Sequence, residues 1–131
     1  MTSPKPPCRV LCVEDDPLQR QALLELLKIL RVTAEAAPDI ATARELLASR
    51  SYDLVLADYN LPDGTADDLL ADARWQARTV VVSANPISSR HASGGPVVAK
   101  PLTRAKLERI LREGACSPEE RQAPEEPSKA P

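Results

Sequence analysis

Short, fully apolar runs separated by stretches with helical spacing dominate the sequence. Most of these runs are rich in Val and Leu and do not alternate with polar residues. Runs of this kind are typical of parallel strands buried between two layers of helices. We therefore expect an α/β chain with one small doubly wound sheet. The predicted strands are Val10–Val13, Val32–Ala36, Leu54–Ala57, Val80–Val82 and Val97–Ala99.

The first helix is the most clearly marked element between these strands. Asp16 can cap it, and Pro17 suits its first position, where a missing N–H costs nothing. Leu24 lies off the stripe that we expect to face the sheet. That stripe consists of Leu18, Ala22, Leu26, Ile29 and Leu30.

The remaining helices are shorter or less regular. Asp39 and Thr103 are positioned to cap two of them, and a third fits only between about Thr65 and Arg74. The segment Ala84–Pro96 contains prolines and adjacent glycines, which disfavour a regular helix. The fourth helix is therefore expected to be short or absent.

Composition bounds the folded part of the chain. The 131 residues are enough for one domain. Seven of the 13 prolines lie in Met1–Pro7 and Ala115–Pro131, so we expect residues 1–7 and 115–131 to be disordered and residues 8–114 to form the domain. The odd count of three cysteines and the single histidine argue against a disulfide scaffold and against structural zinc.

Charge and hydropathy limit the partners. Lys and Arg total 17 against 19 Asp and Glu, and aromatic residues make only 2% of the chain. Such a chain has neither the positive field nor the stacking platforms that nucleic-acid binding uses, so neither nucleic acid nor a membrane is an expected partner. Because no run of eighteen apolar residues occurs, a cytoplasmic location is expected.

Charged and polar side chains directly follow the predicted strands. Glu14 and Asp15 follow the first strand, Asp58 the third, Ser83 the fourth and Lys100 the fifth. Carboxyl ends of parallel strands meet at one edge of the sheet, where ligands bind. Three carboxylates there favour a hard divalent cation, Mg²⁺ more than Ca²⁺ where protein ligands are few. An ammonium and a hydroxyl nearby suit a phosphoryl group.

The motifs around these residues resemble the receiver domain of two-component response regulators over about residues 8–114. The resemblance implies a flavodoxin-like five-stranded parallel sheet of order 2-1-3-4-5 with helices on both faces. The matching pieces are Val10-Leu-Cys-Val-Glu-Asp-Asp-Pro17, Tyr52-Asp-Leu-Val-Leu-Ala-Asp58-Tyr-Asn-Leu-Pro-Asp-Gly64, Val80-Val-Val-Ser83-Ala and Val97-Val-Ala-Lys100-Pro101.

The resemblance implies that Asp58 is the phosphoacceptor. A histidine kinase or a histidine phosphotransfer protein would be the donor, and a downstream protein would be the target. For Mg²⁺ it implies Asp15 and Asp58 as ligands, Glu14 beside them and the backbone carbonyl of Asn60 as a further ligand. Alone, Asp58 would be read as a strand-end aspartate that caps a turn, but the surrounding motif favours the functional interpretation.

For the phosphoryl group the resemblance implies contacts to Ser83 and Lys100, with a cis bond between Lys100 and Pro101. Taken singly, these residues would be a surface serine and a solvated lysine. Backbone N–H groups after Asp58 and Ser83 could complete the cradle.

Two departures from the family pattern leave the mode of signalling open. Val97 stands where many receivers carry an aromatic residue, and the stretch before it is short. With only Pro- and Glu-rich residues after Gly114, we expect a stand-alone receiver, or one cut from a longer protein such as a hybrid kinase, that catalyses only its own phosphorylation and dephosphorylation. The alternatives are a pseudo-receiver that docks independently of phosphorylation and, with less support, a small Mg²⁺-dependent phosphohydrolase.

Overall fold

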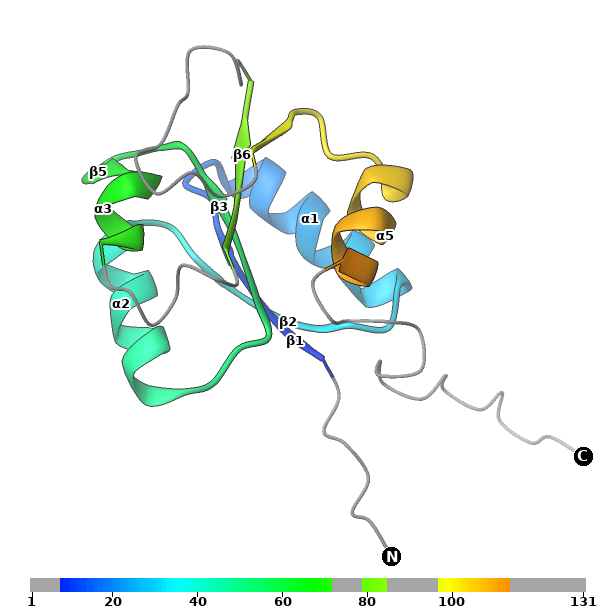
Figure 1. The fold of residues 1–131 in the computed structure, drawn as a ribbon, viewed down its shortest axis with the longest axis horizontal. Helices are drawn as coiled ribbons and strands as arrows, with labels where there is room; N and C mark the ends of the chain where they lie inside the picture. Colours follow the sequence, from blue (N-terminus) through cyan, green and yellow to red (C-terminus); the bar gives the residue numbers. More distant parts are fainter. Residues whose placement is uncertain (1–7, 72–78, 85–96, 114–131) are drawn as a thin grey trace, which may run out of the picture.

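The computed structural model describes residues 8–71, 79–84 and 97–113, and their main feature is a parallel sheet between helices (Figure 1). The strand order is β2-β1-β3-β6-β7, and every neighbouring pair is parallel. All five predicted strands and their doubly wound order are confirmed, with bounds that shift by one residue at most. The strands are β1 (Arg9–Val13), β2 (Thr33–Ala37), β3 (Leu54–Asp58), β6 (Thr79–Ser83) and β7 (Val97–Ala99).

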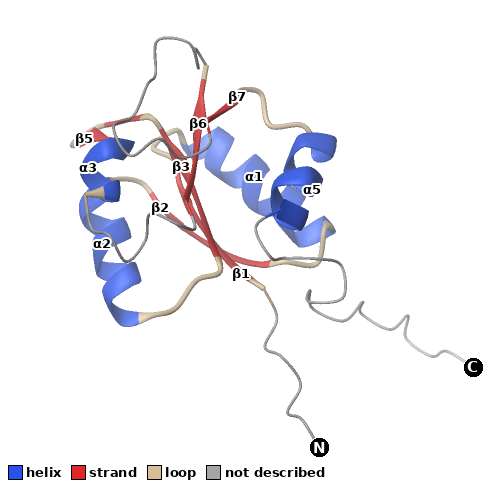
Figure 2. Ribbon diagram, viewed as in Figure 1, coloured by secondary structure: helices blue, strands red, loops and turns tan. Residues whose placement is uncertain are grey.

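The register of the sheet decides where the site lies. Val13 at the end of β1 lies opposite Ala57 in β3, and Asp58 lies opposite Val82 in β6. The residues that follow β1, β3, β6 and β7 therefore leave the sheet at the same edge. Figure 2 shows these strands running together through the middle of the molecule.

Helices cover both faces of the sheet, as predicted. Figure 1 shows α1 and α5 on one face and α2 and α3 on the other. The predicted caps are confirmed: Asp16 accepts from Leu18 N at 2.9 Å, Asp39 from Thr42 N at 2.8 Å and Thr103 from Lys106 N at 3.2 Å. The helices are α1 (Pro17–Ile29), α2 (Ile40–Ser49), α3 (Ala66–Leu70) and α5 (Arg104–Glu113).

Two apolar cores, one on each face, hold these layers together. Along β1, Val10 and Cys12 pack with α1 and α5, whereas Leu11 and Val13 pack on the opposite side. All four side chains are at most 1% exposed. Burial of each such side chain contributes about 1.5–3 kcal/mol, so β1 stabilises the packing of helices on both faces of the sheet.

The predicted core stripe of α1 is confirmed only at Leu26 and Leu30, which pack in the core that α1 shares with α5. Leu18 is 78% and Ile29 61% exposed, and Ala22 is exposed as well. Leu27 is fully buried instead, and Leu24, predicted to lie off the stripe, packs against the same core. Leucines occur on several sides of this helix, so spacing alone does not select the face that meets the sheet.

Some predicted segments lie outside the described residues. The described part of the third helix is Ala66–Leu70, and the rest of the predicted span to residue 74 is not covered. Residues 85–96 of the fourth crossover and the predicted terminal segments also lie outside. The structure adds a short hairpin that the sequence did not predict, β4 (Asn60–Leu61) with β5 (Gly64–Thr65).

The two cysteines in the described ranges, Cys8 and Cys12, are buried. Cys12 is a free thiol, and its burial, followed by the charge of Glu14, raises its pKa to about 12. Cys8 is 2% exposed and is disulfide-bonded, a feature that the odd cysteine count did not predict.

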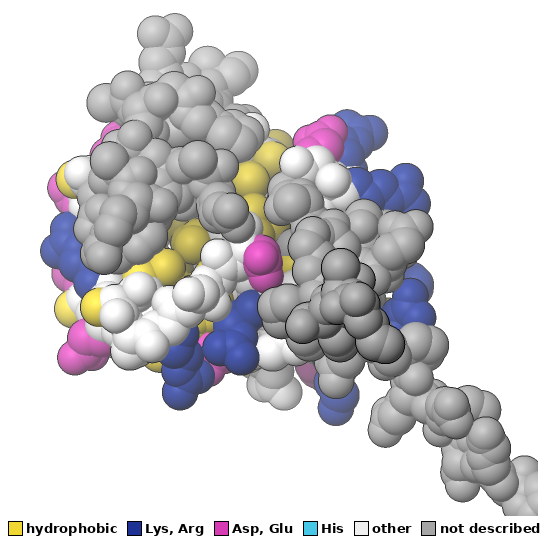
Figure 3. Space-filling model, turned by 60° about the horizontal axis from the view of Figure 1, so that its bottom comes forward, with side chains coloured by type: hydrophobic (Ala, Val, Ile, Leu, Met, Phe, Trp, Pro, Cys, Tyr) yellow, Lys and Arg dark blue, Asp and Glu magenta, His cyan; other side chains and the backbone are white. Residues whose placement is uncertain are grey.

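Charged side chains of both signs lie on the face of the molecule shown in Figure 3. On the face shown in Figure 3, Lys and Arg side chains are interspersed with Asp and Glu around the rim. Among the described residues, no helix is long and apolar enough to cross a membrane.

Candidate functional site

Three of the four predicted metal ligands come together at the carboxyl edge of the sheet. Glu14, Asp15 and Asp58 each offer a carboxylate oxygen, and these oxygens all lie within 4.8 Å of one another. Glu14 is 6% exposed, Asp58 is half-buried and Asp15 is exposed. The cluster is therefore buried at its base and open at one side.

The position of Asp58 disfavours its negative charge. Burial raises the pKa of the Asp58 carboxyl above its ordinary value of 3.8, and the charges of Glu14 and Asp15 raise it further. Lys100 opposes this shift without cancelling it. Among the described residues, the site thus holds more negative charge than the Lys100 ammonium can balance.

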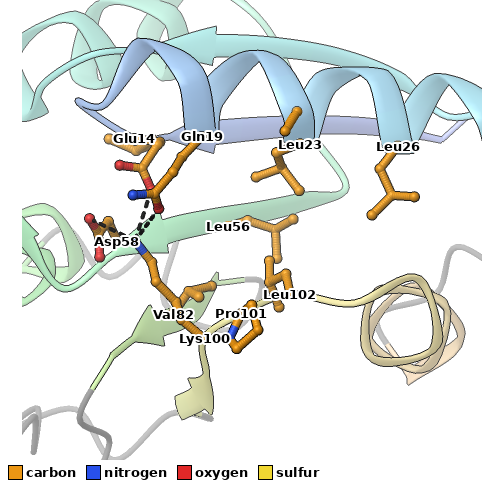
Figure 4. Close-up of a pocket in the computed structure, with 12 residues that line it drawn as sticks. Glu14, Gln19, Leu23, Leu26, Leu56, Asp58, Val82, Lys100, Pro101 and Leu102 are labelled. Carbon is orange, nitrogen blue, oxygen red and sulfur yellow. Dashed lines mark hydrogen bonds and ion pairs between the residues drawn. The ribbon is translucent and has the colours of Figure 1, made fainter.

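Lys100 reaches into this cluster from the loop after β7 (Figure 4). Its Nζ lies 3.0 Å from Glu14 Oε2, 3.3 Å from Asp58 Oδ2 and 2.9 Å from Gln19 Oε1. Burial alone would lower the pKa of the Lys100 ammonium, but the Glu14 hydrogen bond and the Asp58 charge outweigh it and hold that pKa above 10.5. The Lys100–Pro101 bond is cis, as expected.

The carboxylate cluster fits a hard divalent cation. Oxygen ligands, an excess of negative charge and one open side suit Mg²⁺, which keeps several waters and needs few protein ligands. Glu14, Asp15 and Asp58 are the residues that would hold it. Asn60, the fourth predicted ligand, is exposed at the start of β4, and its role stays a prediction.

Backbone and helix contacts hold the acidic loop between β1 and α1 in place. Glu14 Oε1 accepts from Asp16 N at 3.1 Å. The Arg20 guanidinium donates to the carbonyls of Glu14 at 3.0 Å and Asp15 at 3.3 Å. Sequence reasoning missed Arg20 and Gln19, because their signal is only a polar residue in the first turn of a helix. The contacts of Arg20 with the acidic loop and of Gln19 with Lys100 depend on where α1 lies against the sheet edge.

Ser83 and Asp58 lie at the ends of the neighbouring strands β6 and β3. Ser83 is 3% exposed at the end of β6, and its carbonyl accepts from Lys100 N at 2.8 Å. The N–H after Asp58 is not free for an anion in this state, because Tyr59 N donates to Val82 O at 3.0 Å. The backbone cradle for a bound phosphoryl group stays a prediction.

The loop after Asp58 is tied to helix α2. Asp63 Oδ1 accepts from Ile40 N at 2.9 Å and Asp63 Oδ2 from Ala41 N at 3.0 Å, so this carboxylate satisfies two N–H groups at the start of α2. Gly64 follows with φ +149°, and a Cβ there would collide with the Asp68 carboxylate. The fold alone therefore explains why Asp and Gly stand at positions 63 and 64.

An apolar cavity of about 220 Å³ opens beside the charged cluster. Glu14, Gln19, Asp58 and Lys100 line its polar end. Its walls include Leu23, Leu26, Leu56, Val82, Pro101 and Leu102 (Figure 4). The apolar walls reduce the water around Lys100, which strengthens its electrostatic contacts.

Comparison of the chain with known proteins identifies one family. Residues 10–112 match the model of the response regulator receiver domain. The chain is 39% identical over 62 residues to the response regulator protein PilR of Pseudomonas aeruginosa, a match that covers 47% of this chain and 14% of that protein. The chain thus spans a small part of this curated relative.

Solved structures give the same fold. A CheY-like receiver domain from Methylobacillus flagellatus has a TM-score of 0.74 and 26% identity, covering 82% of this chain and 98% of that one. The receiver domain of sensor histidine kinase PA1611 from Pseudomonas aeruginosa has a TM-score of 0.73 and 23% identity, covering 83% and 98%. With the family match over most of its length, the chain belongs to the response regulator receiver domain family.

Proposed function

We propose that this receiver accepts a phosphoryl group on Asp58 from a phosphohistidine, in a Mg²⁺-dependent reaction. The donor would be a histidine kinase or a histidine phosphotransfer protein. The observation that carries the proposal is the Lys100 Nζ, 3.3 Å from Asp58 Oδ2 inside a cluster of three carboxylates. Output would pass through a partner protein or by onward phosphotransfer.

The chemistry follows from positioning and charge. An Asp58 oxygen attacks phosphorus while the P–N bond breaks, and the imidazole nitrogen keeps the electron pair. Lys100 pairs with the phosphoryl oxygens and Ser83 offers a hydroxyl nearby. Bound Mg²⁺ would neutralise charge on the transferring group. Attack of water on the acyl phosphate would restore Asp58, which makes the domain a switch acting on itself.

Similarity to metal-bound receivers supports the cofactor. The PA1611 receiver was solved with a magnesium ion coordinated in its active site cleft. The carboxylate cluster here has the ligand type and the charge that such an ion needs.

Intact mass spectrometry after incubation with Mg²⁺ and acetyl phosphate tests the proposal. We expect one hydroxylamine-labile phosphoryl adduct on the wild type and on Glu45→Gln, which removes an exposed carboxylate on α2. Asp58→Asn should show none, because it lacks the nucleophile.

The absence of an adduct on the wild type would call for a second test, a binding titration with Mg²⁺ and beryllofluoride. Failure of both would overturn the proposal. It would favour a docking module that does not depend on phosphorylation, the alternative that Val97 suggested.

A further inference from the structure

Gln19 connects the cap of α1 to the ammonium of Lys100. Its side chain is exposed at the polar end of the cavity (Figure 4). Gln19 Nε2 donates to Asp16 Oδ2 at 3.1 Å, while Gln19 Oε1 accepts from Lys100 Nζ at 2.9 Å. One amide therefore links two groups that stand far apart in sequence.

The local structure of the helix start leaves the Gln19 oxygen available for this contact. In a capping box, a Gln three residues after the cap accepts from the backbone N–H of the cap residue. Here Asp16 N donates to Glu14 Oε1 instead, at 3.1 Å. Because that N–H is already satisfied, Gln19 Oε1 is free to accept from Lys100.

The other two acceptors of Lys100 belong to the carboxylate cluster. Lys100 Nζ donates to Glu14 Oε2 and pairs with Asp58 Oδ2. Glu14 already uses its second oxygen for Asp16 N. A cation bound by the cluster would compete with Lys100 for the charge of both carboxylates, and a phosphoryl group would occupy an oxygen of Asp58. The neutral Gln19 oxygen is the acceptor least affected by either change.

We propose that Gln19 is a positioning residue that keeps the Lys100 ammonium at the site when the carboxylates are taken up by Mg²⁺ or by a phosphoryl group. This inference rests on the proposed function. Without Gln19, the ammonium of this partly exposed lysine can turn to solvent as its carboxylate partners are drawn away. A substitution should therefore weaken the phosphorylated-like state more than it weakens the metal-bound state.

Lysine Nζ NMR tests the positioning directly, without phosphorylation. The Lys100 ammonium signal is assigned by its absence in Lys100→Met. In saturating Mg²⁺ we expect it to stay observable in the wild type and in Gln21→Met, a matched change on an exposed residue of the same helix. In Gln19→Met it should broaden or disappear, because an ammonium in water exchanges its protons quickly.

Calorimetric titration with beryllofluoride in saturating Mg²⁺ tests the consequence. One hydrogen bond to a charged group in an exposed setting predicts a loss of affinity of about three- to tenfold in Gln19→Met. The affinity for Mg²⁺ alone should change less. In a Lys100→Met background, Gln19→Met should have no further effect, because the two residues act as one unit.

The outcomes separate this inference from the proposed function. Equal beryllofluoride affinity in wild type and Gln19→Met, or an unchanged Lys100 signal, contradicts the role of Gln19 alone. A loss that persists in the Lys100→Met background also overturns it, since Gln19 would then act on something else. A wild type that binds no beryllofluoride contradicts the proposed function, and this inference with it.

Discussion

The pKa values of Asp58 and Lys100 are both raised, although the two side chains form an ion pair. The same direction has opposite consequences for the charge of an acid and of a base. The pKa of Lys100 is raised, so the folded protein favours its charge, whereas the pKa of Asp58 is also raised, so the folded protein disfavours that charge. The two shifts agree once Glu14 and Asp15 are counted, because three carboxylates share one ammonium. The metal-free site therefore stores an electrostatic cost that a cation or a neutral side chain can relieve.

Asp58→Asn should stabilise the metal-free protein at neutral pH. A carboxyl whose folded pKa is raised costs stability above that pKa and nothing well below 3.8, so stability is lost as pH rises between these points. We expect a gain of roughly 0.5–1 kcal/mol at pH 7, at the low end of usual single-substitution effects. Urea denaturation from pH 4 to 7 in a chelating buffer would measure it. A variant less stable than wild type at pH 7 would contradict the electrostatic account.

The sequence predicted the site residues whose position depends only on strand ends. Glu14, Asp15 and Asp58 follow strands directly, and parallel strands place such residues at one edge whatever the side-chain details. Gln19 and Arg20 escaped prediction because their contacts depend on the rotation of α1 about its axis. That rotation was predicted only in part, because Leu26 and Leu30 face the core and the rest of the predicted stripe does not.

Among the elements, the loop after Asp58 is held by a helix from elsewhere in the chain. Asp63 lies five residues past Asp58 and binds two N–H groups of α2. Those hydrogen bonds, the Ile40 N–H first, lower the pKa of Asp63 below 3.8. The sequence motif pointed to this loop, but the partner helix is visible only in the structure.

Asp63→Ala should destabilise the fold through the start of α2. A lost helix cap is expected to lower the melting temperature by a few degrees at pH 7. A depressed carboxyl pKa gives stability that is present above 3.8 and is lost as pH falls through the folded pKa. The difference between wild type and variant should therefore shrink in acid. Thermal melts followed by circular dichroism at several pH values measure this, with Asp53→Ala as a comparison because its carboxylate accepts from Arg9 N, away from α2. A difference that is constant with pH would argue against the charged cap.

Helix α1 marks the limit of prediction for an element. Its start was predicted because Asp16 and Pro17 are local signals, but its buried face was predicted only in part, because Leu residues surround it. The sheet chooses the face through packing against residues distant in sequence, which no local pattern encodes. The central strands β1 and β3 escaped this ambiguity because both of their faces are buried.

For the whole molecule, the site exists only when the sheet is formed. Glu14 and Asp58 are brought together by the pairing of β1 with β3, and Lys100 joins them through the pairing of β6 with β7. In the unfolded chain these groups are far apart. Any ligand of the cluster therefore binds the folded state selectively and must stabilise it.

Mg²⁺ should accordingly raise the free energy of unfolding of the entire domain. At a hundredfold excess over its Kd the expected gain is about 2.7 kcal/mol, and it should grow with the logarithm of concentration. Asp15→Asn should lose most of this gain while remaining folded, because Asp15 is exposed and belongs to the cluster. Urea denaturation at a series of MgCl₂ concentrations, with NaCl matched for ionic strength, separates specific binding from screening. Equal gains in wild type and Asp15→Asn would show that the ion acts elsewhere on the molecule, and the assignment of the carboxylate cluster as the metal site would fail.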